Sequence, residues 1–236
     1  FKGLPSLFNF ELTRIIPESI HAGDAEIFMT AYTHIINAYL SADIPFEDAI
    51  LLSNHDMNRI RSTFGGDIVK SKLAAAILLT LPGTPYIYYG EEIGMLGVKP
   101  DIHLREPFLW AEKSSENTFW EKSKYSLIPD VVPLDMQMDD PKSIYHHYRK
   151  WIGLRNKYPD LANGHPEFKN LQNKALLAYT ISGKKNTFWV IHNLSDQEVS
   201  LPFKDKAEIV SDNTMVQVDD NLVLPGYSSA LIRMGR

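Results

Sequence analysis

The sequence predicts an α/β region over residues 1–165, followed by an all-β region over residues 166–236. Two observations support this fold class. Before residue 165, stretches of helical periodicity alternate with short, continuously apolar runs, as in strand–helix–strand folds with right-handed crossovers. After that point the chain consists of short strand-like runs separated by turns, which is typical of a small antiparallel β-sandwich.

Three helices are expected in the α/β region. The first covers Asp24–Ser41, where the Asp24 side chain can accept hydrogen bonds from free N–H groups of the first turn. The second covers Asp67–Leu81 and ends before Pro82, because proline cannot continue a helix. The third begins at Asp140-Pro141, an acceptor followed by proline at the first helical position. The expected apolar faces are Ile27, Phe28, Ala31, Tyr32, Ile35, Ala38 and Tyr39 in the first helix, and Val69, Leu73, Ala76, Ile77 and Thr80 in the second.

Short apolar runs before and between these helices are expected to be strands. They are Leu7–Phe10, Ala49–Ser53 and Tyr86–Tyr89. Because the runs are continuous and do not alternate with polar residues, they indicate parallel strands buried on both faces. Asp130–Asp140 is expected to be a loop, and Pro159–Pro166 to connect the two regions.

The all-β region opens with an expected hairpin. Ala175–Ile181 and Thr187–His192 flank a five-residue loop that contains glycine. Further strands are expected at Glu198–Phe203, Glu208–Ser211, Met215–Val218, Asn221–Leu224 and Ser229–Met234.

Composition excludes several classes of protein. The 236 residues are 44% hydrophobic and 22% charged, which excludes a disordered chain and a fibre. The net charge of −5, without any basic run, argues against nucleic acid as a partner. The absence of cysteine excludes disulfides, a thiolate nucleophile and cysteine-based metal sites. The longest apolar stretch, Leu73–Leu81, is too short to cross a bilayer, so we expect a soluble chain with no membrane partner, either cytoplasmic or secreted.

Polar residues directly follow one of the expected strands. Asn54, His55 and Asp56 come after the run that ends at Ser53. In α/β folds, ligands bind in the crevice beyond the carboxyl ends of the strands, so these residues are candidates for a functional site. The alternative is a local network in which Asn54 and His55 hold the loop and Asp56 caps the next segment.

Two further clusters follow the next expected strand. Gly83–Gly94 contains a tyrosine-rich run and the adjacent carboxylates Glu91 and Glu92, which could serve as acid or base but more often anchor a loop. Arg105–Trp110 places an arginine beside aromatic residues, a combination suited to sugar rings. The alternative for Trp110 is an ordinary buried tryptophan.

Together these segments resemble the α-amylase family of glycoside hydrolases. Ala49–Asp56 resembles the strand and Asn-His-Asp motif at the family's seventh barrel strand, and Gly83–Gly94 resembles its eighth strand. Arg105–Trp110 resembles the segment after it, and Leu4–Phe10 is similar to the sixth strand. The β-rich tail resembles the family's C-terminal sandwich. The resemblance implies a partial (β/α)8 TIM barrel, comprising strands six to eight and their helices, followed by a small antiparallel β-sandwich.

The resemblance also implies residue roles. Asp56 would be the third catalytic carboxylate, which hydrogen-bonds the 2- and 3-hydroxyls of the sugar at the cleavage point and is not the nucleophile. His55 and Asn54 would bind the same substrate, and Arg105 would lie on the leaving-group side. No metal ligand or cofactor is expected in this chain. Calcium remains open for a longer parent protein, because the family's calcium ligands come mostly from upstream loops.

The nucleophile and the acid/base carboxylate that retaining glycosidases need are missing from the sequence. In the family they belong to motifs at the fourth and fifth strands, and neither motif occurs here. An eight-stranded barrel also needs about 250 residues, more than the 165 that precede the tail. We therefore expect a chain that starts at Phe1 within a barrel and is inactive alone. Its unpaired strand edges should make it aggregate unless an N-terminal complement is present.

Several functions fit these expectations. The first is an α-amylase acting on α-1,4-glucosidic bonds of starch-like glucans, and a close alternative is an α-glucosidase or oligo-1,6-glucosidase acting on short saccharides. A different class would be a non-catalytic, amylase-like binding or scaffold subunit, although the intact Asn54-His55-Asp56 triplet argues against it. The remaining reading is a sugar-binding sandwich with an incidental α/β lead-in.

Overall fold

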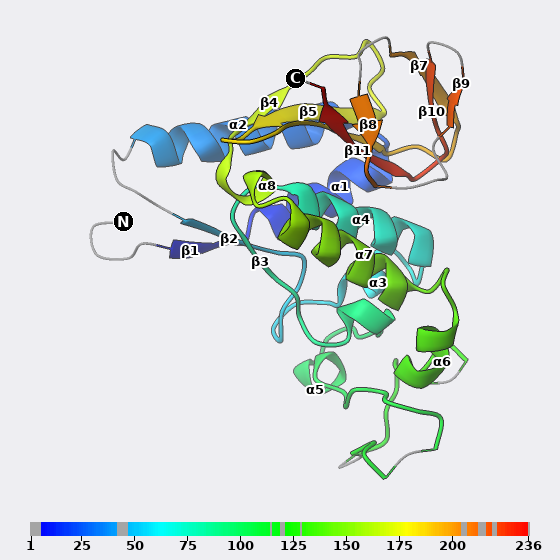
Figure 1. Ribbon diagram of the computed structural model, residues 1–236. Helices are drawn as coiled ribbons and strands as arrows, with labels where there is room; N and C mark the ends of the chain where they lie inside the picture. Colours follow the sequence, from blue (N-terminus) through cyan, green and yellow to red (C-terminus); the bar gives the residue numbers. More distant parts are fainter. Residues whose placement is uncertain are drawn as a thin grey trace.

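The computed structural model contains a parallel sheet with its helices and, beyond them, two antiparallel sheets (Figure 1). It describes residues 6–41, 47–113, 115–118, 121–127, 129–203, 207–211, 216–218 and 221–235. Leu4 and Pro5 of the segment similar to a sixth barrel strand lie outside the described residues, as does Met215 at the start of another expected strand.

The three short apolar runs form one parallel sheet, as the sequence predicts. Its strands are β1 (Ser6–Asn9), β2 (Glu47–Leu51) and β3 (Thr84–Tyr86), with β2 in the middle. β2 begins and ends two residues earlier than expected, and β3 begins two residues and ends three residues earlier. Ser53 and Tyr89 therefore lie beyond the ends of the strands. The expected ends were wrong because the apolar runs continue past the last hydrogen-bonded pair of each strand.

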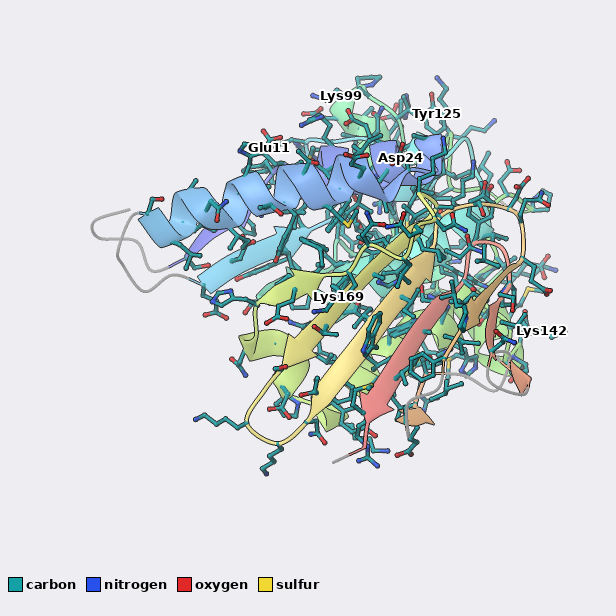
Figure 2. All side chains as sticks on the ribbon, turned by 90° about the horizontal axis from the view of Figure 1, so that it is seen from above. Glu11, Asp24, Lys99, Tyr125, Lys142 and Lys169 are labelled. Atoms are coloured by element: carbon teal, nitrogen blue, oxygen red, sulfur yellow. The ribbon has the colours of Figure 1, made fainter. Side chains whose placement is uncertain are left out.

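Two of the expected helices are confirmed to within one residue at each end. They are α2 (Ala25–Ser41) and α4 (Ile68–Thr80). The Asp67 carboxylate caps α4, accepting hydrogen bonds from the N–H groups of Val69 at 2.8 Å and Lys70 at 3.1 Å. Asp24 lies directly before α2, where its carboxylate accepts the N–H of Glu26 at 3.0 Å (Figure 2). None of the helices in the described ranges is long and apolar enough to cross a membrane.

Other helix boundaries differ from those expected. The third helix, α7 (Ile144–Lys157), begins at Ile144 rather than at Asp140, because Ser143 is its cap and accepts the N–H of His146 at 3.2 Å. The segment expected as a loop before it contains α6 (Leu134–Asp139). A helix absent from the expectations, α1 (Leu12–Ala22), follows β1 and has Pro17 within it. The remaining short helices are α3 (Ile60–Thr63), η1 (Glu91–Ile93), α5 (Asp101–Leu104) and α8 (Asp160–Asn163).

Helix α4 is buried on nearly every side, and this overturns the expected single apolar face. Every residue from Leu73 to Leu81 is buried, whereas Val69, expected on the apolar face, is 46% exposed. The cause is position: α4 packs against α1 and α7 and also contacts β6 and β11 of the antiparallel region (Figure 1). In α2, the buried face consists of Ala25, Phe28 and Tyr32, while Ile27 is 37% exposed.

The all-β region forms two antiparallel sheets. One has the strand order β4-β5-β6-β11-β8 and the other has the order β7-β10-β9. The hairpin loop between β5 and β6 has four residues instead of five, because Ser182 pairs with Thr187. The strands are β4 (Pro166–Phe168), β5 (Leu176–Ser182), β6 (Thr187–Asn193), β7 (Val199–Pro202), β8 (Ala207–Ile209), β9 (Val216–Val218), β10 (Asn221–Leu224) and β11 (Ser229–Met234).

A buried polar network joins α4 to the five-stranded sheet. His192 of β6 is fully buried, and its Nδ1 lies 2.7 Å from the Ser229 hydroxyl. Its Nε2 lies 3.2 Å from the hydroxyl of Thr80, the last residue of α4. The Tyr179 hydroxyl of β5 lies 2.9 Å from the same Thr80 oxygen. Burial lowers the pKa of His192 to about 3, so the imidazole is neutral in the folded chain.

A buried arginine fixes the end of α4. Arg155 of α7 donates from Nη1 to the carbonyl oxygens of Leu79 at 3.0 Å and Leu81 at 2.7 Å. It donates from Nη2 to the carbonyl oxygen of Gly83, directly before β3. Backbone carbonyls at a helix end have no partner within the helix, so the guanidinium supplies the donors that they need. This contact sets the path of the chain from α4 into β3.

Replacing Arg155 by methionine should lower the free energy of unfolding by roughly 2–4 kcal/mol, because it leaves buried carbonyl oxygens without donors. Urea unfolding followed by circular dichroism measures the change, on the chain together with its N-terminal complement where the chain alone is insoluble. Arg149→Met, at an exposed position of the same helix, is the matched control and should change stability by less than about 0.5 kcal/mol. Equal stabilities of the two variants would contradict the assignment.

His192 should make the fold sensitive to acid. Its pKa is 6.5 in the unfolded chain and about 3 in the folded one, so below pH 6.5 only the unfolded state takes up the proton. The free energy of unfolding should therefore fall by up to about 1.4 kcal/mol per pH unit between pH 6.5 and 3. Unfolding curves at pH 7, 5.5 and 4 should show a weaker pH dependence for His192→Gln than for His34→Gln, whose histidine lies exposed on α2. The same pH dependence in both variants would exclude His192 as the cause.

Candidate functional site

The segment after β2 is a tight turn built by Asn54. The side-chain oxygen of Asn54 accepts the N–H of Asp56 at 2.9 Å, and its backbone carbonyl accepts the N–H of Met57 at 3.3 Å. Asn and Asp side chains favour turns because they can hydrogen-bond the backbone two residues later. The turn leaves the His55 and Asp56 side chains in the open, 61% and 57% exposed.

Arg105 reaches this turn from a distant part of the chain. Its Nη2 donates to Asp56 Oδ1 at 2.9 Å, and its Nε donates to the backbone carbonyl of His55 at 3.1 Å. The same Nη2 donates to Asp101 Oδ2 at 3.1 Å, so Asp56 and Asp101 share this donor nitrogen. His55 Nε2 lies 3.1 Å from Asp56 Oδ2. The structure thus brings His55, Asp56 and Arg105 into one exposed cluster, and Asn54 closes the turn that carries the first two.

The alternative interpretation, a local network that holds the loop and caps the next segment, agrees with the structure only in part. Asn54 holds the loop, as a purely local network would require. Asp56, however, does not cap the next helix, because the cap of α3 is Arg59, without a side-chain hydrogen bond. An exposed carboxylate, imidazole and guanidinium beyond the end of a strand offer both acceptors and donors to a ligand rich in hydroxyl groups.

The adjacent carboxylates Glu91 and Glu92 differ in exposure, since Glu91 is buried and Glu92 is partly exposed. Glu91 is 2% exposed and accepts a hydrogen bond from the hydroxyl of Ser53, the residue before Asn54. Burial raises the pKa of Glu91 to about 8, although the Ser53 hydroxyl and the charge of Arg59 oppose the shift. A group so fully enclosed cannot reach a substrate, so this carboxyl anchors a loop.

Arg59 is the residue of this region that sequence reasoning missed. It is fully buried, with its guanidinium 4.6 Å from the ring centre of Tyr88 and 4.8 Å from that of Tyr89. Its Nη1 donates to the Tyr89 carbonyl oxygen at 2.6 Å, which ties the segment after β2 to the segment after β3. The tyrosines at the end of an apolar run were the available signal, since such rings often hold a cation.

The segment after Arg105 is held by a second buried carboxylate and exposes an aromatic pair. Glu106 accepts the N–H groups of Lys124, Tyr125 and Ser126 at 2.8–3.1 Å, which fixes the loop that follows. Trp110 is 45% exposed and lies 4.5 Å, centre to centre, from the ring of Phe108. The alternative expectation of an ordinary buried tryptophan is therefore wrong.

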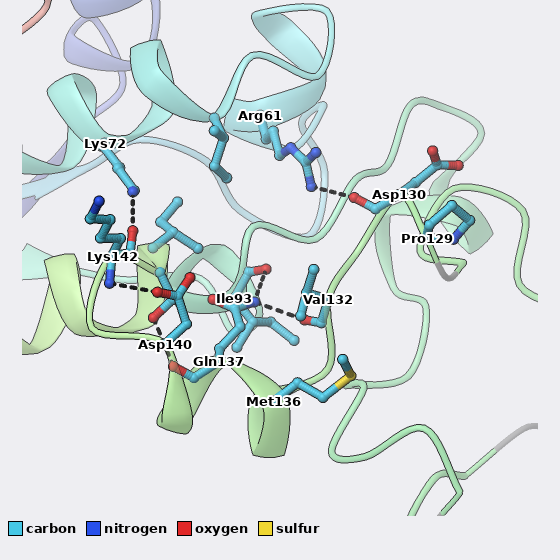
Figure 3. A pocket seen from close by; sticks show the side chains of 13 residues that line it. Arg61, Lys72, Ile93, Pro129, Asp130, Val132, Met136, Gln137, Asp140 and Lys142 are labelled. Carbon is cyan, nitrogen blue, oxygen red and sulfur yellow. Dashed lines mark hydrogen bonds between the residues drawn. The ribbon is translucent and has the colours of Figure 1, made fainter.

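A separate cavity of about 300 Å³ lies between α4 and α6 (Figure 3). Arg61 borders it and donates to the Asp130 carbonyl oxygen at 2.7 Å, and Lys72 donates to the Lys142 carbonyl oxygen at 2.5 Å. None of the residues of the Asp56 cluster lines it. Throughout the described part of the chain, no three His, Asp or Glu side chains gather as a metal site would require.

Comparison with known protein families agrees with this geometry. The family model "Alpha amylase, catalytic domain" matches residues 2–164, and the model "Alpha-amylase SusG C-terminal domain" matches residues 176–231. The first match includes β1–β3 and the Asp56 cluster, and the second covers most of the antiparallel region.

Individual relatives show the same resemblance. The chain is 39% identical to Alpha-amylase 3 of Dictyoglomus thermophilum, covering 99% of this chain and 48% of that protein. It is 32% identical to Alpha-amylase SusG of Bacteroides thetaiotaomicron, covering 100% of this chain and 36% of that protein. The crystal structure of an alpha-amylase from H. orenii superposes with a TM-score of 0.88 at 32% identity, over 99% of this chain and 49% of that one. The chain spans about half the length of these relatives or less, and it belongs to the alpha-amylase family of glycoside hydrolases.

Proposed function

We propose that this chain is the C-terminal portion of a retaining glycoside hydrolase that cleaves α-1,4-glucosidic bonds in starch-like glucans. The observation that carries the proposal is the exposed cluster of His55, Asp56 and Arg105 beyond the carboxyl end of β2. Catalytic residues of barrel enzymes lie at this end of the strands. In this proposal β1, β2 and β3 are barrel strands six, seven and eight, residues 1–165 belong to the barrel, and residues 166–236 form the C-terminal domain.

The division of catalytic work follows from the residues present. Retaining hydrolysis requires a nucleophilic carboxylate and an acid/base carboxylate about 5–5.5 Å apart, and we assign both to the part of the protein upstream of this chain. Asp56 then accepts hydrogen bonds from the 2- and 3-hydroxyls of the sugar at the cleavage point. These bonds strengthen as positive charge develops on the ring, so they lower the barrier more than they tighten substrate binding.

The neighbours of Asp56 have supporting roles. His55 and Arg105 present N–H donors beside it, so the cluster can bind sugar hydroxyls that act as acceptors. Arg105 lies on the leaving-group side, and the Phe108–Trp110 pair near it in sequence offers aromatic surface to further sugar rings. Asn54 supports the substrate site by shaping the turn. The carboxylate chemistry needs no cofactor from this chain.

Two other functions remain alternatives. The higher-identity relatives are named alpha-amylases, which favours an α-amylase over an α-glucosidase or oligo-1,6-glucosidase. The product profile of the complete protein distinguishes them, since an α-amylase releases mixed oligosaccharides and an exo-acting glucosidase releases glucose alone. A non-catalytic scaffold subunit is disfavoured because the turn aims Asp56 outward beside two donors, an arrangement that scaffolding alone does not need.

Asp56→Asn in the complete protein should reduce kcat/KM on a labelled maltooligosaccharide by roughly 10³-fold, equivalent to about 4 kcal/mol of lost transition-state stabilisation. The amide keeps the size of the side chain but removes the charge and one acceptor. Asp139→Asn, at an exposed position of α6, is the control and should retain parental activity. A fully active Asp56→Asn variant with unchanged products would refute the assignment of Asp56.

The chain alone should show no turnover, and co-expression with the N-terminal half of the barrel should restore it. The reason is that both carboxylates of the covalent mechanism lie outside this chain in our proposal. Release of labelled saccharide is measured for each half and for the co-expressed pair, with and without Asp56→Asn. Turnover by this chain alone that Asp56→Asn abolishes would show that it holds a complete site.

A further inference from the structure

The buried carboxyl of Glu91 is connected to the Asp56 turn through the side chain of Ser53. The Ser53 hydroxyl donates to Glu91 Oε1, and Ser53 is itself buried at 2% exposure. The next residue, Asn54, forms the turn whose hydrogen bond to the Asp56 N–H sets the direction of that carboxylate. One side-chain hydrogen bond and one turn therefore separate Glu91 from the exposed cluster.

Glu91 and Ser53 follow different strands of the sheet. Glu91 begins η1, after β3, whereas Ser53 follows β2. Burial raises the pKa of the Tyr148 hydroxyl of α7 well above its usual range, and the nearby charge of Glu91 raises it further. The far end of the loop is also held, because the N–H of Arg59 donates to the Gly97 carbonyl oxygen at 3.0 Å. The loop that carries Asp56 is thus fixed at both ends by the segment after β3.

The Ser53 hydroxyl and the charge of the buried Arg59 favour a carboxyl in this place, and burial opposes it. Moving a carboxyl group out of water is unfavourable, and Glu91 Oε2 is buried. Apolar residues of the same size as a buried polar pair are often neutral or stabilising when both partners are replaced together. A side chain that only filled space here would be apolar. What the carboxyl supplies is a directional acceptor for Ser53.

We propose that Glu91 is a positioning residue for Asp56, acting through Ser53. The inference rests on the proposed function, because it presumes that Asp56 acts on substrate. Small displacements of a group that acts mainly in the transition state reduce kcat more than they change KM. Loss of the Glu91–Ser53 contact should therefore affect the rate of the chemical step while the fold persists.

The test compares variants of the complete protein, with kcat, KM and Tm measured for each. In Ser53→Ala/Glu91→Leu both partners become apolar, and we expect a kcat reduced at least tenfold and a KM within threefold of the parent when both are assayed well below the Tm of the variant. Glu91→Gln keeps an acceptor for Ser53 and should restore kcat to within threefold. Glu92→Leu, which removes the adjacent carboxyl and keeps the hydrogen bond from Ser53 to Glu91, should leave kcat unchanged when assayed well below its Tm.

The outcomes separate this inference from the proposed function. If Asp56→Asn is inactive and the double variant keeps parental kcat, Glu91 is structural only and the inference is wrong. A double variant that loses kcat only in proportion to a lowered Tm would also contradict it. If Asp56→Asn is fully active, the proposed function itself fails.

Discussion

One buried guanidinium holds the point where α4 turns into β3, and the geometry of the candidate site depends on it. Arg155 gathers three backbone carbonyls there, the last belonging to Gly83. β3 follows at once, and the segment beyond it carries Tyr89 and Glu91, which bind Arg59 and Ser53. The position of the exposed cluster thus depends on the end of α4, on β3, and on the two buried polar contacts that follow β3.

Local features of this fold could be predicted from the sequence. The Asp67 cap needs only the residue and the two N–H groups that follow it, and α4 lies within one residue of its expected bounds. The environment of α4 could not be predicted in the same way. Helical periodicity identifies a face by assuming solvent on the other side, and here a second layer of structure replaces the solvent. Val69, on the first turn of α4, is 46% exposed, whereas every residue from Leu73 to Leu81 is buried.

In the candidate site, too, the local features could be predicted from the sequence and the tertiary contacts could not. The Asn54–Asp56 segment could be located because it follows a strand, and the turn that shapes it is local. The Arg105–Asp56 contact joins residues 49 positions apart, and only the resemblance to a family suggested that they belong together. Glu91 and Glu92 are adjacent carboxylates in the sequence, yet Glu91 is buried and accepts the Ser53 hydroxyl, while Glu92 is partly exposed. Such differences arise from tertiary packing, which no pattern of spacing encodes.

The parallel sheet has a further consequence. β1 and β3 are its outer strands, each with one unpaired side in the described structure, and Phe8, Phe10 and Tyr86 are about half exposed. In the proposed barrel a single upstream segment has to pair with both outer strands. If it pairs with only one of them, the other keeps an unpaired edge that favours aggregation. We therefore expect the solubility of this chain to report on closure of the barrel. A library of upstream segments could be sorted for correct barrel assembly by light scattering, with no substrate and no intact catalytic carboxylates.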